Sequence, residues 1–269
     1  MMSTGRRLTR LATCVRAPNA GPMTLDGTNT YVVRAPGSPR VVVVDPGPLD
    51  EGHLAEIERF GTVELILLTH GHHDHSDAVA QLAAKTGAVA RAVDERWCIG
   101  GDPLRGGDVV AAAGAEIEVV ATPGHTSDSV CFVLPGDAGP DQGAGSCPSI
   151  LTGDTILGRG TTVIAHPDGS LSNYLSSIER LRRLGRLHVL PAHGPALPDL
   201  AAICEIYLAH RRDKLELVRS VISGRRADPG DVDLVQRVIA AAYTHAPEGV
   251  LPAARASVRA QLEYLALEG

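Results

Sequence analysis

The chain has few aromatic side chains and no long hydrophobic run. Phe, Trp and Tyr make up only 3% of the 269 residues, although hydrophobic residues as a whole make up 44%. A sizeable core is therefore available, and it must be built mostly of Val, Leu, Ile and Ala. No apolar run reaches the roughly 18–20 residues that a membrane-spanning helix needs, so we expect no membrane partner.

Cysteine usage is equally restrictive. The five cysteines are odd in number and include no C-x-x-C pair, which argues against a disulfide framework and against a cysteine-based zinc site. The basic amino-terminal stretch, MMSTGRRLTRLATCVRAPN, has no apolar segment after its arginines, so we do not expect a secretion signal. The sequence therefore favours a reducing, cytoplasmic location.

Positive charge is also scarce. The net charge is −6, which gives no general attraction to DNA, RNA or anionic membranes. Two local basic segments, RLRRLGR (180–186) and HRR (210–212), could contact phosphates. However, residues 199–269 carry 9 Lys and Arg against 10 Asp and Glu, and solvated helix faces explain most of these charges.

Hydrophobic patterning predicts a mixture of strands and helices up to about residue 198 and only helices beyond it. The β-branched runs TNTYVVR (28–34), RVVVVDPG (40–47) and VELILLT (63–69) are predicted strands. Further strands are expected at 88–92, 116–122, 129–134 and 149–153, and a strand running into a loop at 187–195. Helices are expected at 49–60, 76–88, 171–185, 199–223, 231–243 and 252–269. We therefore predict a domain over residues 1–198 and a helical domain over residues 199–269.

The segment THGHHDH (69–75) is the strongest functional signal, because it places four of the 11 histidines directly after a predicted strand. On a loop leaving a strand, residues two apart point similarly, so His70 and His72 can reach one metal ion. Asp74 and His75 follow where the backbone turns and can reach a second ion. Imidazole and carboxylate ligands suit zinc, with iron or manganese as alternatives.

One loop cannot complete two tetrahedral sites, and three further segments offer ligands. TPGHTSDS supplies His125, LTGDTILG supplies Asp154, and LPAHGP supplies His193, each after a predicted strand. Gly, Pro and Thr surround each of them, as expected of tight loops that aim a side chain. A carboxylate such as Asp154 can share its two oxygens between two metal ions.

The ordered series H-x-H-x-D-H, PGHT, GDT and PxHG resembles the metallo-β-lactamase superfamily over residues 25–198. The resemblance implies a four-layer αβ/βα sandwich, in which two sheets face each other with helices outside and a metal cleft at one edge. It implies two zinc ions and a hydroxide, formed between them, that attacks a carbonyl or a phosphorus. The implied roles are His70, His72 and His125 on the first zinc; Asp74, His75 and His193 on the second; Asp154 as bridge; Asp45 as support of the histidine loop; and Asp74 as the residue that orients the hydroxide.

Further segments resemble one branch of this superfamily, the β-lactamase-like protein 2 group. They are GTNTYVV, GDTILGRGTTV, NYLSSIERL and IYLAHRRDKLELV, so the resemblance covers nearly the whole chain. This group carries a small winged-helix-like domain after its hydrolase domain, and one of its members cleaves single-stranded RNA. Two departures stand out. Ala192 replaces the usual Gly, and the chain ends at LALEG where the group continues into strands, so we expect no complete β-wing.

The resemblance leaves several substrates open. Single-stranded RNA follows from the group, and thioester hydrolysis follows from Asp154, because a bridging Asp also occurs in glyoxalase-II-like thioesterases. Weak β-lactam opening is a third activity, while a metal- or RNA-binding module without turnover represents another class. His166 and His73 are candidate substrate contacts, for which the alternative is a solvated loop position. The predicted partners are thus a small ester or thioester, or single-stranded RNA.

Overall fold

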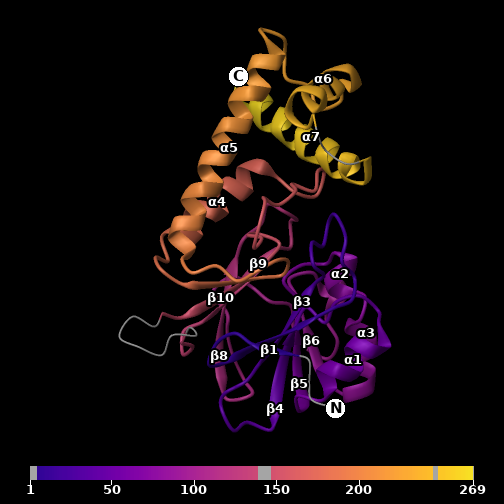
Figure 1. Ribbon diagram of the computed structural model, residues 1–269, viewed down its shortest axis with the longest axis vertical. Coiled ribbons are helices and arrows are strands. Elements are labelled where there is room, and N and C mark those ends of the chain that lie inside the picture. The colour runs from indigo at the N-terminus through magenta and orange to yellow at the C-terminus, as the bar shows by residue number, and fades with distance from the viewer. Residues whose placement is uncertain (1–4, 139–146, 245–247, 269) are drawn as a thin grey trace. The chain divides into compact units, whose positions relative to one another are not determined.

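The structure is a computed structural model that describes residues 5–138, 147–244 and 248–268 (Figure 1). Contacts within the chain divide it into two compact units. The first, here called the sheet unit, contains Met1–Ala121, Asp128–Gly160 and Arg186–Asp199. The second, the helical unit, contains Thr122–Ser127, Thr161–Gly185 and Leu200–Gly269. The two units do not follow the predicted boundary at residue 198, because residues 161–185 belong to the helical unit. The two domains expected from the sequence remain a prediction.

The first sheet of the sheet unit has six strands that follow one another in chain order. They are β1 (Arg6–Arg7), β2 (Ala12–Arg16), β3 (Asn29–Val33), β4 (Arg40–Val44), β5 (Thr62–Leu67) and β6 (Val89–Arg91). β1 to β4 pair antiparallel, whereas β4, β5 and β6 are parallel. The parallel register sets Val44 beside Leu67, so the residues that follow β4 and β5 emerge at the same edge.

The second sheet of the sheet unit has five strands in the order β11-β10-β9-β8-β7. They are β7 (Val109–Ala112), β8 (Ala115–Ala121), β9 (Val130–Leu134), β10 (Ser149–Gly153) and β11 (His188–Pro191). β10 and β11 pair parallel, and the other neighbours pair antiparallel. The loops after β10 and β11, which carry Asp154 and His193, therefore also leave from one edge.

The strand β4 contributes to two separate cores, because its side chains alternate between the faces of the sheet. Val42 and Val44 pack with residues of the second sheet, such as Phe132. Val41 and Val43 pack on the other face with the helices of the same unit. The run VVVV and residues Leu65–Leu68 of ELILL are thus buried because both faces of their sheet are covered, as the sequence predicted.

The helices of the sheet unit are α1 (Glu51–Glu58), α2 (His73–Ser76) and α3 (Val79–Thr86), with a 3-10 turn, η1 (Glu95–Trp97). Figure 1 shows α1 and α3 beside each other on one side of the six-stranded sheet. Asp50 caps α1 by accepting a hydrogen bond from His53 N at 2.7 Å, and α3 ends at the left-handed Gly87. The short helix α2 begins inside the predicted histidine loop and gives Asp74 and His75 a helical backbone.

The helical unit contains α4 (Leu171–Arg182), α5 (Leu200–Ile222), α6 (Val232–Ala242), η2 (Glu248–Val250) and α7 (Leu251–Glu268). These bounds agree with the helices predicted from the sequence to within a few residues. Tyr174 of α4 and Tyr207 of α5 are fully buried, which shows that the two helices share a packed interface. Among the described residues, no helix has the length and apolar character needed to cross a membrane.

The packing of α1 generates a stability prediction. Leu54 is 0% exposed, so Leu54→Ala should leave a cavity and lower the free energy of unfolding by about 2–5 kcal/mol. Leu49→Ala is the matched control, because Leu49 is 63% exposed and its truncation should change the free energy by less than about 0.5 kcal/mol. Urea unfolding of both variants measures the difference, and equal losses would contradict this account of the core.

Candidate metal centre

The carboxylate of Asp45 organises the histidine loop. Asp45 follows β4, is 2% exposed and has a positive φ of 52°. Its Oδ1 accepts a hydrogen bond from Thr69 N at 2.8 Å, and its Oδ2 accepts one from Thr69 Oγ1 at 2.7 Å. The same Oδ2 lies 2.9 Å from Nδ1 of His75. Because Nδ1 is engaged in this way, the Nε2 atom of His75 faces the opposite direction.

His70 and His72 face each other at the start of the loop, and Asp154 lies close to both. Nε2 of His70 is 3.0 Å from Nδ1 of His72. One ligand atom from each of these two histidines and from Asp154 lies within 4.8 Å of the others. Two ligands about 2.0–2.1 Å from a tetrahedral zinc ion lie about 3.4 Å from each other. The spacing of this first group therefore fits a single cation.

Glycine is required between the two histidines. A Cβ atom on Gly71 would lie 2.5 Å from Nε1 of Trp97 and 3.3 Å from a carboxylate oxygen of Asp128. The backbone N–H of Gly71 donates to that same Oδ2 of Asp128 at 2.9 Å. The loop is thus held from two sides, by Asp45 at Thr69 and by Asp128 at Gly71.

A second group consists of Asp74, His75 and His193, whose ligand atoms also lie within 4.8 Å of one another. Nε2 of His193 is 3.1 Å from Oδ2 of Asp74, and Nε2 of His75 is 3.5 Å from it. Both Nε2 atoms are buried and make no hydrogen bond of good geometry. Buried polar atoms are usually satisfied, and a cation between these residues would satisfy both.

Asp154 connects the two groups. Its Oδ1 lies 3.2 Å from Nε2 of His193 and 3.6 Å from Nε2 of His75, while the same residue belongs to the group of His70 and His72. The preceding residue, Gly153, has a φ of 50°, and a Cβ there would lie 2.6 Å from the Thr69 side chain. The close approach of these two loops explains why glycine precedes the aspartate in GDT.

His125 lies on the turn after β8, within the segment that belongs to the helical unit. Its Nδ1 lies 2.6 Å from the carbonyl oxygen of Val163 and 3.2 Å from Oγ1 of Thr162. Nδ1 can donate to that carbonyl, which leaves Nε2 as the atom with a lone pair for a ligand. Asp168 fixes the same turn, because its carboxylate accepts hydrogen bonds from N and Oγ of Ser127 at 2.9 and 2.6 Å.

The carboxylates of this region favour positive charge on their neighbours. Burial raises the pKa of Asp74, but the nearby His193 and His75 rings outweigh burial and hold the pKa well below its ordinary value. Burial lowers the pKa of His75, yet the charges of Asp154 and Asp45 bring it well above its ordinary value. The pKa of His193 is raised against burial in the same way, mainly by Asp154. The electrostatics therefore suit bound cations as well as bound protons.

The two proposed substrate contacts lie outside both ligand groups. The side chain of His73 is 90% exposed, and its Nδ1 lies 2.9 Å from Asp77 Oδ1. His166 belongs to the helical unit, where its Nε2 lies 3.8 Å from a carboxylate oxygen of Glu263. A role of either residue in substrate binding remains a prediction.

Sequence reasoning missed several residues that support the site. Asp128 and Asp168 stand near the motifs, but nothing in their spacing distinguishes them from surface acids. Arg211 was grouped with the basic segment HRR, yet it is only 3% exposed. Its Nη2 donates to the carbonyl oxygen of Thr162 at 2.6 Å, and its guanidinium lies 4.9 Å from the ring centre of Tyr174. Arg211 thus supports the residue that contacts His125.

Comparison with known proteins agrees with the fold. A family model described as the metallo-beta-lactamase superfamily matches residues 23–138. A beta-lactamase-like protein 2 homolog from Drosophila melanogaster is 30% identical over 283 residues, which cover 98% of this chain and 90% of that protein. Lactamase-like protein vrtG from Penicillium aethiopicum is 32% identical over 83% of this chain and 68% of its own length. Lactamase-like protein nscB from Aspergillus fumigatus is 32% identical over 77% and 60%, so the chain spans less than two thirds of that relative.

Solved structures extend the comparison. The metallo-beta-lactamase family protein TTHA1429 from Thermus thermophilus superposes with a TM-score of 0.74 at 22% identity, over 95% of this chain and 93% of that one. TTHA1623, solved in a di-iron-bound form, gives 0.51 at 26% identity over 66% of this chain and 92% of that one.

Two facing sheets that carry histidine and aspartate groups on their edge loops define a metal-dependent hydrolase of the α/β class. The chain belongs to the metallo-β-lactamase superfamily. The predicted family and fold class, with a helical C-terminal region, are thereby confirmed. The resemblance to the β-lactamase-like protein 2 group over nearly the full chain is confirmed as well.

The hydrogen bonds of Asp45 generate a prediction about metal binding. Asp45→Asn removes the negative charge beside His75 and replaces one acceptor oxygen by a donor, so we expect metal affinity to fall by about 10–100-fold. Competition with a chromogenic chelator measures the affinity. His73→Ala serves as the control, because His73 is exposed and outside both groups, and it should bind metal like the unchanged protein. An unchanged affinity in Asp45→Asn would remove Asp45 from the support of this site.

Arg211 generates a second prediction. Arg211→Met keeps much of the side-chain volume but leaves the carbonyl of Thr162 without this donor, so the free energy of unfolding should fall by about 1–3 kcal/mol. The neighbouring Arg212→Met removes an exposed arginine and should have little effect. Chemical unfolding compares the two variants, and an equal response would show that the buried hydrogen bond is dispensable.

Proposed function

We propose that this protein is a dinuclear zinc-dependent hydrolase that cleaves phosphodiester bonds of single-stranded RNA. In this proposal, His70, His72 and His125 hold one zinc ion, while Asp74, His75 and His193 hold the other. Asp154 bridges the two ions through its carboxylate. Six of these residues lie in the sheet unit and fall into two groups, His70 with His72 and Asp154, and Asp74 with His75 and His193.

One observation carries the proposal, namely the position of Asp154 between the two groups. Its Oδ1 lies within 3.6 Å of Nε2 on both His75 and His193, and its carboxylate also belongs to the group of His70 and His72. A single carboxylate in contact with two nitrogen-rich groups is the arrangement that a bridging ligand requires.

The donor chemistry supports zinc, because imidazole nitrogen and carboxylate oxygen are usual zinc ligands. The same donors also bind iron and manganese, and the di-iron form of TTHA1623 makes iron the main competitor. Asp45 and the carbonyl of Val163 each lie beside the Nδ1 atom of one histidine. Contacts of this kind fix the tautomer that presents Nε2 to a metal.

A pair of such metal ions, when bound, lowers the pKa of a shared water towards neutrality and polarises the substrate oxygen. The protein's own contribution is to orient this chemistry and to move the proton. Asp74 suits that role, because its side chain is 29% exposed whereas that of Asp154 is 12% exposed. Asp74 can thus accept a proton from the attacking water and pass it to solvent or to the leaving group.

The choice of RNA rests on similarity over nearly the whole chain to a beta-lactamase-like protein 2 homolog, together with the resemblance to a group that includes a nuclease. Thioester hydrolysis is the alternative, because a bridging aspartate serves that reaction equally well, and weak β-lactam opening would be a side reaction. A cytoplasmic location remains part of the proposal. All of these activities would use the same metal pair and the same proton carrier.

A substrate panel tests the proposed function. Single-stranded RNA, bis-(p-nitrophenyl) phosphate, an acyl-glutathione thioester and nitrocefin are each incubated with the zinc-loaded protein. We expect RNA to give the highest kcat/KM, and we expect Asp74→Asn and Asp154→Asn to lower it by at least about 100-fold. Elemental analysis should find two zinc ions per chain in the unchanged protein.

The controls separate the alternatives. Removal of metal by chelation should abolish turnover, and added zinc should restore it. A thioester rate far above the RNA rate would replace the proposed substrate but keep the site. Two bound zinc ions without turnover on any substrate would instead identify a binding module.

A further inference from the structure

Two basic segments that are far apart in the sequence meet in one groove of the helical unit. The groove lies between α4 and α5 and has a volume of about 600 Å³. RLRRLGR contributes Arg180 and Arg183, and HRR contributes Arg212. The sequence alone indicated solvated helix faces for these charges, whereas the structure collects three of them around a single hollow. This set of residues is called the arginine groove below.

Two of the three arginines of the groove are unpaired within the described part of the chain. Glu179 is the acidic residue in its lining, and its carboxylate is already bound by Nε of Arg182 at 3.0 Å. Among the described residues, the side chains of Arg183 and Arg212 make neither an ion pair nor a hydrogen bond with the protein. Both are exposed, so their guanidinium groups are available to a ligand.

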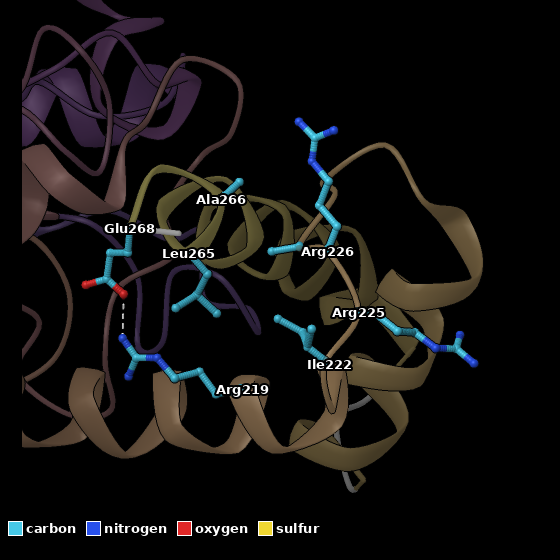
Figure 2. A pocket seen from close by; sticks show the side chains of 9 residues that line it. Arg219, Ile222, Arg225, Arg226, Leu265, Ala266 and Glu268 are labelled. Carbon is cyan, nitrogen blue, oxygen red and sulfur yellow. Dashed lines mark hydrogen bonds and ion pairs between the residues drawn. The ribbon is translucent and has the colours of Figure 1, made fainter.

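A second hollow in the same unit is also lined by three arginines. It is lined by Arg219, Arg225 and Arg226 together with Leu265 and Glu268 (Figure 2). Arg219 is paired with Glu268 at 2.5 Å. Figure 2 shows that the side chains of Arg225 and Arg226 extend in different directions from each other. These two residues therefore provide a matched control with the same number of removable charges.

We propose that the arginine groove binds the phosphate backbone of single-stranded RNA. Guanidinium groups bind phosphate through two parallel hydrogen bonds, and the apolar floor of Leu175 and Leu208 adds contact for the sugar and base without reading sequence. Among the described residues, no aromatic side chain lines the groove, so recognition would depend on the backbone and would show little base preference. This proposal rests on the proposed function and adds a site that holds the substrate strand.

The net charge of the chain, −6, is unfavourable for binding RNA over the whole surface. A protein of this charge does not attract a polyanion over its whole surface, so any affinity for RNA must come from a local positive site. A plot of the logarithm of the binding constant against the logarithm of the salt concentration has a negative slope. Each phosphate of a single strand that the protein neutralises contributes about −0.7 to this slope. The loss of two arginines that bind phosphate should therefore reduce the steepness of this dependence by about 1.4.

The test compares two double variants in the full-length chain. Arg183→Gln with Arg212→Gln removes two charges from the arginine groove, and Arg225→Gln with Arg226→Gln removes two charges elsewhere in the helical unit. Binding of a fluorescein-labelled 12-nucleotide single-stranded RNA is followed by fluorescence anisotropy between 50 and 300 mM salt, with Asp74→Asn present in all samples to prevent cleavage. Thermal unfolding checks that both double variants fold.

We expect the groove variant, Arg183→Gln with Arg212→Gln, to bind RNA at least about tenfold more weakly at low salt and to show the flatter salt dependence given above. The control variant, Arg225→Gln with Arg226→Gln, should bind RNA like the parent. In the background with Asp74 intact, the groove variant should raise KM for RNA and leave the rate on bis-(p-nitrophenyl) phosphate within about twofold. Equal affinities of the two double variants would overturn the proposal. Loss of binding to a polyglutamate peptide but not to RNA would overturn it in favour of an acidic protein partner.

This design separates the groove from the chemistry. If RNA binding depends on the arginine groove but RNA is not hydrolysed, the groove proposal is supported and the proposed ribonuclease function is rejected. If RNA is hydrolysed with the same KM by the groove variant and by the parent, the proposed function is supported and the groove proposal is rejected.

Discussion

The hydrogen bonds of one buried carboxylate underlie the geometry of the candidate metal centre. Asp45 accepts from the backbone and the hydroxyl of Thr69 and lies against Nδ1 of His75. These contacts fix where the histidine loop leaves β5 and which nitrogen of His75 faces the other ligands. A buried carboxylate is costly unless its oxygens are satisfied, so the loop and the carboxylate stabilise each other. The remaining ligands converge on a loop that is already held in place.

The sheets bring the other ligands to this loop. β4 and β5 are parallel neighbours, as are β10 and β11, and parallel strands end at the same edge of a sheet. Asp45 and Thr69 therefore emerge together from one sheet, and Asp154 and His193 emerge together from the other. The apolar faces of the two sheets pack against each other, which holds these edges in register. Asp154 lies beside His193 because β10 and β11 are parallel neighbours, and it lies beside His75 because the two sheets pack together.

Two neighbouring arginines of the helical unit, Arg211 and Arg212, have different roles. Arg211 is buried, donates to the carbonyl of Thr162 and stacks on Tyr174, so it acts in the interior of the unit. Its sequence neighbour Arg212 lines the exposed groove between α4 and α5. Adjacent residues on a helix are about 100° apart, which places them on different faces. Because the two arginines of HRR lie on different faces of α5, Arg211 acts as a structural residue and Arg212 as a candidate ligand contact.

The sequence by itself determined the types of elements, the family and the residues able to bind metal. Runs such as VVVV and ELILL could be assigned to buried strands because their period and length are local properties, and H-x-H-x-D-H, PGHT, GDT and PxHG carry their donors within a few residues. The roles of Asp128, Asp168 and Arg211 could not be predicted, because each acts through a partner distant in the chain. Only the tertiary structure decided the distances from Asp154 to His75 and His193 and brought Arg183 and Arg212 to one groove. The physical reason is that ligand distances and charge clustering depend on how strands and helices pack, which no single segment encodes.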